Sequence, residues 1–301
     1  MRRNATPCRF SGGASWVILN PIEQSIKAKI EKVGTPLKDW DIRIYRGILT
    51  GCNEAFIIDG NKRIEILNNC QSKDERERTD ELIRPILRGR DIKRYSYEWA
   101  GLYIIATFPS LHIDIEKYPA VKKHLLSFGM ERLEQTGKTY TKCGIKISAR
   151  KKTNNKWFET QDQIGYWDDF SKPKIVWGEI SNKANFALDE NNHYFINNKC
   201  YLLAGEKLFF LTCYLNSHLS EYLFSKIATT TGVGTAQWSK FTIEQLYVPQ
   251  INRNYEDTFN IMFLGLKKNE ITEDAINRCI YDICNLSLSE VKFIENYSNS
   301  I

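Results

Sequence analysis

Four short apolar segments in the middle of the chain lie so close together that they restrict how this part can fold. Each has three or four residues, and they cover residues 174–177, 186–188, 194–196 and 200–203. Turn residues such as Asn191 and Asn192 separate them. A parallel connection between two strands needs a crossover of a dozen or more residues, and no gap here is that long. The spacing therefore predicts antiparallel strands.

Helix signals lie on both sides of these strands. Asn20 is a suitable N-cap, Pro21 suits the first helical position, and Glu23 falls at the third, so a helix is expected over 20–34. Apolar residues at helical spacing predict further helices, over 119–135 and 206–227. The leucines of the last segment line one face, which we assign to the core.

Shorter patterns supply the remaining expected elements. Alternation and short apolar runs predict strands over 40–45, 55–58, 63–66 and 102–106. Asp59, Gly60 and Asn61 are read as the turn between the second and third of these strands. Gly129 is a weak point in the helix around it, and Thr242 is read as the cap of a short helical turn.

These elements predict an α+β fold with mixed, mainly antiparallel sheets and packed helices. We expect this domain to cover residues 1–250 and a small helical C-terminal region to cover 251–301. In the latter, Ser287 and Glu290 have the spacing of a capping box. Residues 254–301 hold eight acids and four bases, so this region is acidic.

Composition excludes several classes of protein. Hydrophobic residues are 42% and charged residues 26%, as in folded globular chains, and no apolar run is long enough for a membrane helix. We therefore expect no membrane partner. Eight cysteines occur without a CxxC pair, which favours free thiols in a reducing cytoplasm over a zinc site. No N-terminal targeting signal is visible, and a cytoplasmic location is expected.

The positive charge is concentrated in one segment. Residues 137–157 hold seven bases and no acid, while the whole chain carries +6, so the remainder sums to −1. The segment has no helical period, and a long loop with one strand over 144–148 is expected. Such a patch indicates a polyanionic partner, although a solvated lysine-rich loop is an equally good interpretation of the charge alone.

No complete catalytic constellation is present in the sequence. The dinucleotide motif GxGxxG is absent, and Asn20-Pro21 lacks the second proline and the aromatic residue of an amino-methyltransferase loop. Glu290-Val291-Lys292 has the letters of a nuclease metal motif, but on an expected helix. We therefore expect no catalytic residue, metal site or cofactor in this chain.

Several strings, read in order, resemble one family. They are GILTGCNEAFII over 47–58, RPILRGRDIKRY over 84–95, YW at 166–167 followed by KPKIVW over 172–177, NKCYLL over 198–203, LNS over 215–217 and QWSKFTIEQLYVP over 237–249. Their order and spacing resemble the TaqI-like C-terminal specificity domain, the target recognition domain of adenine-N6 methyltransferases and of fused type II restriction-modification enzymes. The resemblance covers about residues 15–250.

The resemblance implies recognition of double-stranded DNA and not catalysis. In the family, a methyltransferase domain precedes this region and uses S-adenosylmethionine, and Mg²⁺ serves where the parent also cleaves. Neither catalytic motif lies in these 301 residues. We therefore expect either an excised part or a separate specificity subunit. Its partners would be DNA and a methyltransferase or endonuclease domain.

A recognition domain needs basic side chains on phosphates and polar side chains on base edges. The candidate phosphate contacts are Lys138, Lys142, Lys146, Lys151, Lys152, Lys156, Arg90, Lys93, Arg94 and Lys240. The candidate base readers are Arg150 for guanine and Gln237 for adenine, with Thr231 in the polar loop over 229–237. Polar residues interleaved in the basic segment can also donate to or accept from base edges, and they are Thr139, Thr141, Ser148, Thr153, Asn154 and Asn155. Thr50 and Asn53 are candidates through the loop over 47–53.

Structural explanations compete with some of these assignments. Gly47, Thr50, Gly51 and Asn53 shape a turn beside DNA or only hold the sheet. Arg90 is expected to form an internal ion pair with Asp91. Large aromatic residues usually belong to cores, and we assign Trp177 and Trp238 there.

Three other functions remain open on the sequence alone. The first is a divergent nuclease or methyltransferase, and the second is an RNA or single-strand binding module. The latter uses aromatic platforms among its bases, and the basic segment offers only Tyr140, with Trp157 at its edge. The third is a scaffold protein with a lysine-rich loop, which would show no salt-dependent DNA binding.

Overall fold

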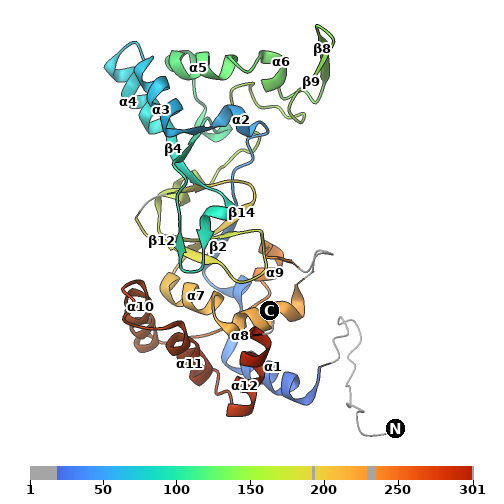
Figure 1. Ribbon diagram of the computed structural model, residues 1–301, viewed down its shortest axis with the longest axis vertical. Coiled ribbons are helices and arrows are strands. Elements are labelled where there is room, and N and C mark those ends of the chain that lie inside the picture. Colours follow the sequence, from blue (N-terminus) through green and yellow to red (C-terminus); the bar gives the residue numbers. More distant parts are fainter. Residues whose placement is uncertain (1–18, 192–193, 229–234, 300–301) are drawn as a thin grey trace. The chain divides into compact units, whose positions relative to one another are not determined.

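The computed structural model describes residues 19–191, 194–228 and 235–299 (Figure 1). The chain forms two compact units. The terminal unit comprises Met1–Ile42, Ser181–Ala184 and Glu206–Ile301, and the central unit comprises Arg43–Ile180 and Asn185–Gly205. The units therefore do not divide at residue 250, because residues 251–301 belong with the first part of the chain.

The terminal unit is mainly helical. Its helices are α1 (Pro21–Val33), α7 (Leu208–Leu215), α8 (His218–Ile227), α9 (Lys240–Ile243), α10 (Arg253–Lys267), α11 (Glu273–Ile283) and α12 (Leu288–Ser298). Strands β1 (Gly34–Pro36) and β16 (Tyr247–Pro249) pair antiparallel. This unit also contains the short elements η1 (Leu37–Asp39), β11 (Ile180–Ser181) and β15 (Ala236–Gln237). Helix α10 packs on α7, and α12 packs on α8 and α1.

Local capping signals set several helix ends in this unit. The expected capping box at α1 is confirmed, since Asn20 Oδ1 accepts from the Glu23 amide at 2.9 Å. The helix expected over 206–227 is two helices, because the Ser217 hydroxyl caps α8 and interrupts the run. The cap of α9 is Ser239, so the assignment of Thr242 as the cap was wrong.

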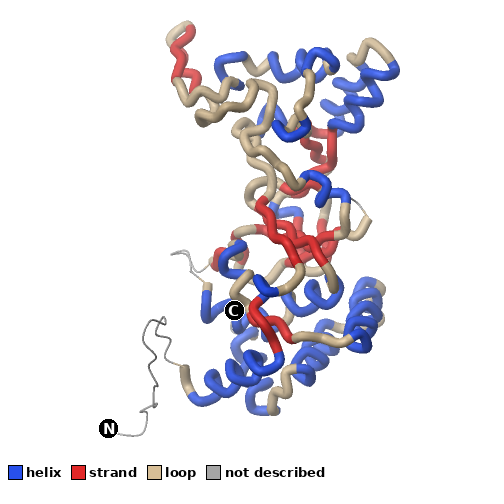
Figure 2. Tube along the Cα trace, turned by 180° about the vertical axis from the view of Figure 1, so that it is seen from behind, coloured by secondary structure: helices blue, strands red, loops and turns tan. Residues whose placement is uncertain are grey.

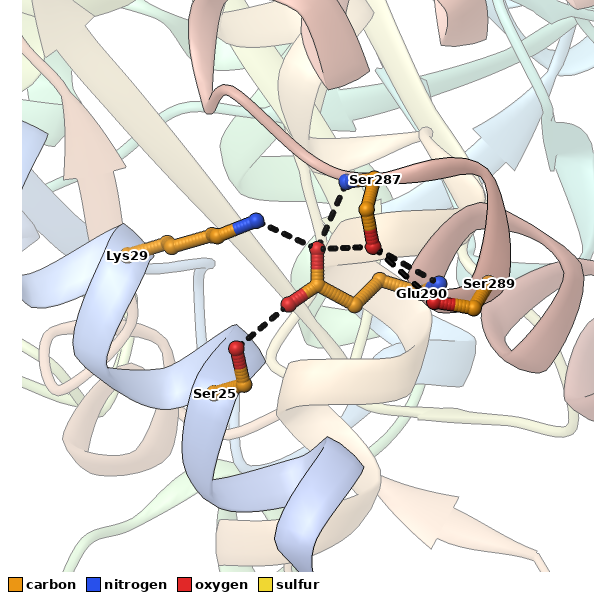
Figure 3. Close-up of polar contacts among 5 residues, drawn as sticks. All are labelled: Ser25, Lys29, Ser287, Ser289 and Glu290. Carbon is orange, nitrogen blue, oxygen red and sulfur yellow. Dashed lines mark hydrogen bonds and ion pairs between the residues drawn. The ribbon is translucent and has the colours of Figure 1, made fainter.

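A buried carboxylate joins α12 to α1 (Figure 3). Glu290, 3% exposed, accepts from Ser25 Oγ and from Lys29 Nζ, each at 2.6 Å, and from the Ser287 amide at 2.6 Å. Burial by itself raises the pKa of Glu290, because it disfavours the charged carboxylate. The hydrogen bonds to that carboxylate have the larger combined effect and lower the pKa to about 2. The expected capping box at Ser287 is confirmed, and the acidic C-terminal helices are part of this unit's packing.

The central unit contains two four-stranded sheets. One has the order β12 (Phe186–Asp189), β10 (Lys174–Gly178), β14 (Cys200–Gly205), β2 (Ile42–Arg46), and β10 is antiparallel to β12 and β14. The other has the order β13 (Phe195–Ile196), β4 (Ile83–Leu87), β7 (Leu102–Ile105), β3 (Ile57–Asp59). Strand β13 is parallel to β4, so the antiparallel prediction was wrong for this segment. The two strands are distant in sequence, and no tight connection limits their direction.

Helices and two small hairpins surround these sheets. The helices are α2 (Asn53–Phe56), α3 (Gly60–Asn68), α4 (Lys73–Leu82), α5 (Pro119–Leu126) and α6 (Met130–Leu133), with short 3-10 turns η2 (Gly89–Asp91), η3 (Pro109–Leu111), η4 (Ile115–Lys117) and η5 (Trp167–Ser171). The hairpins are β5 (Ile92–Lys93) with β6 (Ser96–Tyr97), and β8 (Thr139–Lys142) with β9 (Ile145–Ser148).

One expected strand pair is instead a strand followed by a helix. Residues 63–66 lie in α3, and residues 55–58 divide between α2 and β3. Asp59 is the N-cap of α3 and accepts from the Lys62 amide at 2.8 Å. An Asp-Gly-Asn sequence suits a hairpin turn and a helix start equally well, which explains the error.

Two other expectations hold in the described residues. The break at Gly129 is confirmed, since this residue has φ +87° between α5 and α6. Trp177 is 1% exposed in the central core, and Trp238 is 3% exposed and stacks on Phe224 at 3.7 Å. Both tryptophans are therefore core residues.

Candidate DNA interface

The basic segment forms a two-stranded ribbon that projects beside α6, as Figure 2 shows. Strands β8 and β9 pair antiparallel, and the two residues between them, Cys143 and Gly144, have φ values of +50° and +77°. Two consecutive residues with positive φ form the hairpin turn whose twist matches that of the flanking strands. Residues 139–148, about half of the segment expected as a loop, therefore form a hairpin, and its second strand lies within the strand expected over 144–148.

The two faces of this hairpin differ. On one face, Tyr140 Oη donates to Glu134 Oε2 at 2.6 Å, and Lys142 Nζ lies 3.0 Å from Glu131 Oε1. These bonds hold that face against α6 and the residue that follows it. The opposite face carries only exposed polar side chains, which are Thr139, Thr141, Lys146 and Ser148.

Five lysines of the basic segment are exposed and have no ion pair among the residues that the structure describes. They are Lys138, Lys146, Lys151, Lys152 and Lys156. Lys156 Nζ lies 5.5 Å from the centre of the Phe158 ring, and Lys142 is the member already paired with Glu131. Unpaired ammonium groups keep their full charge available for an anion such as a phosphate.

Arg150 does not belong to this exposed set. It is 2% exposed, and its guanidinium donates to four backbone carbonyls at 2.6–2.8 Å, those of Leu133, Thr50, Glu159 and Trp157. Burial lowers the pKa of Arg150 to about 10, so the group remains charged at neutral pH. The prediction that it reads guanine is wrong for this geometry, because its donors already have acceptors inside the protein.

The loop over 47–53 is also structural in most of its residues. Thr50 is fully buried, and its hydroxyl bonds to Asn53 Oδ1 at 2.7 Å and to the Cys52 amide at 3.1 Å. Gly51 has φ +75°, and a Cβ there would lie 2.9 Å from Arg150 Cδ. This geometry contradicts the assignment of Thr50 to DNA; Asn53 is exposed, but its side-chain oxygen is engaged by Thr50.

The second basic cluster differs in its pairing from the expectation. The partner of Asp91 is Arg88, with Nε 2.9 Å from Oδ2 and Nη2 2.8 Å from Oδ1, so the expected Arg90–Asp91 pair was wrong. Arg90 is exposed, and Lys93 Nζ donates to the Arg90 carbonyl at 3.0 Å. Arg94 is half-buried, with its guanidinium 5.6 Å from the Tyr95 ring. This cluster packs beside β10 and β12, whereas the hairpin packs on α6.

The remaining candidates belong to the terminal unit. Gln237 is half-buried in β15, and Lys240 is exposed with its Nζ 3.6 Å from Glu244 Oε1. Thr231 lies outside the described residues. The geometry neither contradicts nor tests a contact of Gln237 or Lys240 with DNA, and these stay predictions.

The structure adds one basic residue that the sequence pattern missed. Arg132, on α6, lines a shallow depression of about 590 Å³ together with Lys146, Ser148 and Lys151. Its Nη2 lies 2.8 Å from Glu54 Oε1. Arg132 lies before the acid-free segment, in an expected helix, so the charge pattern along the sequence did not include it. The tertiary fold places it beside the hairpin.

The described residues lack two kinds of arrangement. Among them, no group of three or more His, Cys, Asp or Glu side chains is arranged to hold a metal ion. In the same ranges, no helix combines the length and apolar character of a membrane span.

Comparisons with known proteins give a family and a fold. The family model described as the TaqI-like C-terminal specificity domain matches residues 84–248. The solved structure of the type IIL restriction-modification enzyme MmeI in complex with DNA is similar, with a TM-score of 0.56 and 10% identity over 87% of this chain and 36% of that chain. The type IIG restriction endonuclease BpuSI matches with a TM-score of 0.46 and 14% identity over 87% and 32%.

This chain thus spans about a third of the length of both solved structures. No curated protein matches it significantly in sequence. The expected α+β architecture with antiparallel sheets and a helical C-terminal region is confirmed.

Proposed function

Because the chain belongs to the family of TaqI-like C-terminal specificity domains and so has a role in DNA target recognition, we propose that it binds a short site in double-stranded DNA and holds it for a catalytic domain. The observation that carries this proposal is the set of unpaired lysines around the β8–β9 hairpin. Five exposed ammonium groups gather in a segment that contains no acid. Such a surface suits the phosphates of a duplex.

The parent activity is a further part of the proposal. The resemblance of the sequence favours an adenine-N6 methyltransferase, with or without an endonuclease activity, whose catalytic domain is a separate part or subunit. S-adenosylmethionine, and Mg²⁺ for cleavage, would bind in that domain. A double-stranded DNA partner is in keeping with a cytoplasmic location.

Selection from a randomised duplex library at two salt concentrations tests the proposal. We expect enrichment of one short asymmetric motif and a steep salt dependence. If all five lysines meet phosphates, log K falls by about 4.5 for each tenfold rise in salt. No duplex binding at low salt would contradict the proposal and favour a scaffold role.

Two matched double variants distinguish the contribution of the basic segment to DNA binding from that of the net charge of the chain. Replacing Lys151 and Lys152 by alanine removes two exposed cations beside the hairpin, and replacing Lys267 and Lys268 removes two from the end of α10. We expect the first pair to reduce the salt slope by about 2 and the second pair to leave it unchanged. Equal effects would mean that net charge alone drives binding.

A further inference from the structure

We propose that the outer face of the β8–β9 hairpin enters the major groove and reads base edges, which makes Thr139, Thr141, Lys146 and Ser148 the specificity-determining residues of the central unit. This inference rests on the proposed function and names the residues through which it is exerted. It narrows the polar residues of the basic segment to those on one face of the hairpin, leaves out Arg150, and moves Lys146 from phosphate to base edges.

The pairing register defines the outer face. Thr139 lies opposite Ser148, and Thr141 lies opposite Lys146, so their four side chains share one side of the ribbon. All four residues are exposed, and within the described ranges none of their side chains makes a hydrogen bond to the protein. The face therefore serves neither packing nor the internal hydrogen-bond network.

The inner face is engaged by the protein near its base, while Lys142 and Ile145 at its tip are exposed. Tyr140 and Ile147 are opposite each other and half-buried, and Tyr140 bonds to Glu134. Lys142 on the same side is held by Glu131. The division leaves one face for anchoring and one for a ligand.

The dimensions and chemistry of the outer face suit DNA. Paired strands lie about 4.8 Å apart, and a major groove about 12 Å wide admits a two-stranded ribbon. A threonine or serine hydroxyl can donate to or accept from a base edge, a threonine methyl can contact that of thymine, and a lysine can donate to guanine O6 and N7. Lys138 directly precedes β8, and Lys151 and Lys152 follow β9, which puts cations at the foot of the ribbon for the phosphates along the groove.

The foot of the ribbon is held firmly. The Arg150 amide donates to the Glu134 carbonyl at 2.9 Å, and the Gly137 amide donates to the Arg150 carbonyl at 2.8 Å. The buried Arg150 side chain then joins this point to the carbonyls of Thr50 and Glu159. A reading element fixed in this way loses little conformational freedom on binding, as specific recognition requires.

The test is a library selection with the full chain and two single variants, Thr141→Val and Lys146→Met. Valine keeps the shape and strand propensity of threonine but removes its hydroxyl, and neither exposed side chain supports the fold. We expect each variant to lose about 5- to 100-fold of discrimination at one or two base positions. Preference at the other positions should persist.

Two control variants make the outcome specific. Tyr140→Phe removes an inner-face hydroxyl and should leave the preferred motif unchanged. Lys151→Ala should weaken binding to all sequences alike.

The outcomes separate this inference from the proposed function. An enriched wild-type motif that neither Thr141→Val nor Lys146→Met alters would overturn the inference alone, as would uniform weakening without a change of preference. Duplex binding by the wild-type chain without any enriched motif would overturn both. Circular dichroism of each variant checks that the fold is unchanged.

Discussion

Glu290 in the terminal unit and Arg150 in the central unit are both buried charges, but their partners differ in kind. Glu290 bonds to the Lys29 ammonium and to the hydroxyl of Ser25, and so joins two regular helices. Arg150 bonds to backbone carbonyls of loops and helix ends, with no side chain among those acceptors. The comparison shows that in the terminal unit a buried ion pair joins helices whose own backbone bonds are already made. In the central unit, the side chain of Arg150, together with that of Gln135, supplies donors to backbone carbonyls of irregular segments.

The comparison predicts its largest effect at Arg150. Replacing Arg150 by methionine leaves three carbonyls without their donor, while that of Glu159 keeps Gln135 Nε2 at 3.1 Å, and we expect a loss of about 3–5 kcal/mol in the free energy of unfolding of the central unit. Urea denaturation measures the loss, and hydrogen exchange over residues 137–157 locates it.

Arg132→Met is the matched control, since it removes a partly exposed guanidinium from the neighbouring helix. Its expected cost is below about 1 kcal/mol. If Arg150→Met were no more destabilising than this control, the central role given to Arg150 would be wrong.

A smaller effect is expected at Glu290. Glu290→Gln keeps the shape of the side chain but removes the charge that Lys29 and Ser287 stabilise, at an expected cost of about 2 kcal/mol. Hydrogen exchange should rise over α1 and α12 and stay unchanged over β8 and β9. Glu270→Gln, at an exposed residue beyond α10, is the control and should cost under about 0.5 kcal/mol.

The two charges also predict different responses to acid. The pKa of Glu290 is lowered from 4.5 to about 2 in the folded state, so its stabilisation is present above pH 4.5 and is lost as the pH falls towards 2. Arg150 keeps its charge throughout this range. Comparing wild-type and Glu290→Gln unfolding between pH 6 and 2 should therefore show the difference in stability shrinking; a constant difference would contradict the assignment.

The smallest predicted effect distinguishes residues that support the fold from residues that contact DNA. Thr50→Val removes a buried hydroxyl that bonds to Asn53 and to the Cys52 amide, and it should cost about 1 kcal/mol. Since Thr50 is fully buried, the preferred DNA motif should stay the same. A changed motif in the library selection would restore Thr50 as a candidate for DNA contact.

Local signals in the sequence predicted the elements whose causes are local. The caps at Asn20 and Ser287 and the break at Gly129 depend on a few neighbouring residues, and the structure confirms them. The parallel pairing of β13 with β4 depends on residues distant along the chain. Nothing within either short strand specifies that partner.

The candidate site shows the same division. The sequence located the basic segment, and five of its lysines are indeed exposed. The sequence could not distinguish Arg150 from these lysines, because the acceptors that hold its guanidinium inside the protein include a carbonyl distant in sequence, that of Thr50. Charged residues are usually at the protein surface, but long-range packing decides which residue of a charged segment is buried.

The separation of the two hairpin faces has a consequence for how such a chain can change over generations. The side chains of Thr139, Thr141, Lys146 and Ser148 are exposed and make no hydrogen bond within the described part of the chain, so substitutions there should be nearly neutral for folding. Substitutions at Arg150 or Gly51 should lower stability, because Arg150 is buried and a Cβ at Gly51 would lie 2.9 Å from Arg150 Cδ. A lineage can thus acquire new DNA preferences through a few codons while the supporting residues stay fixed.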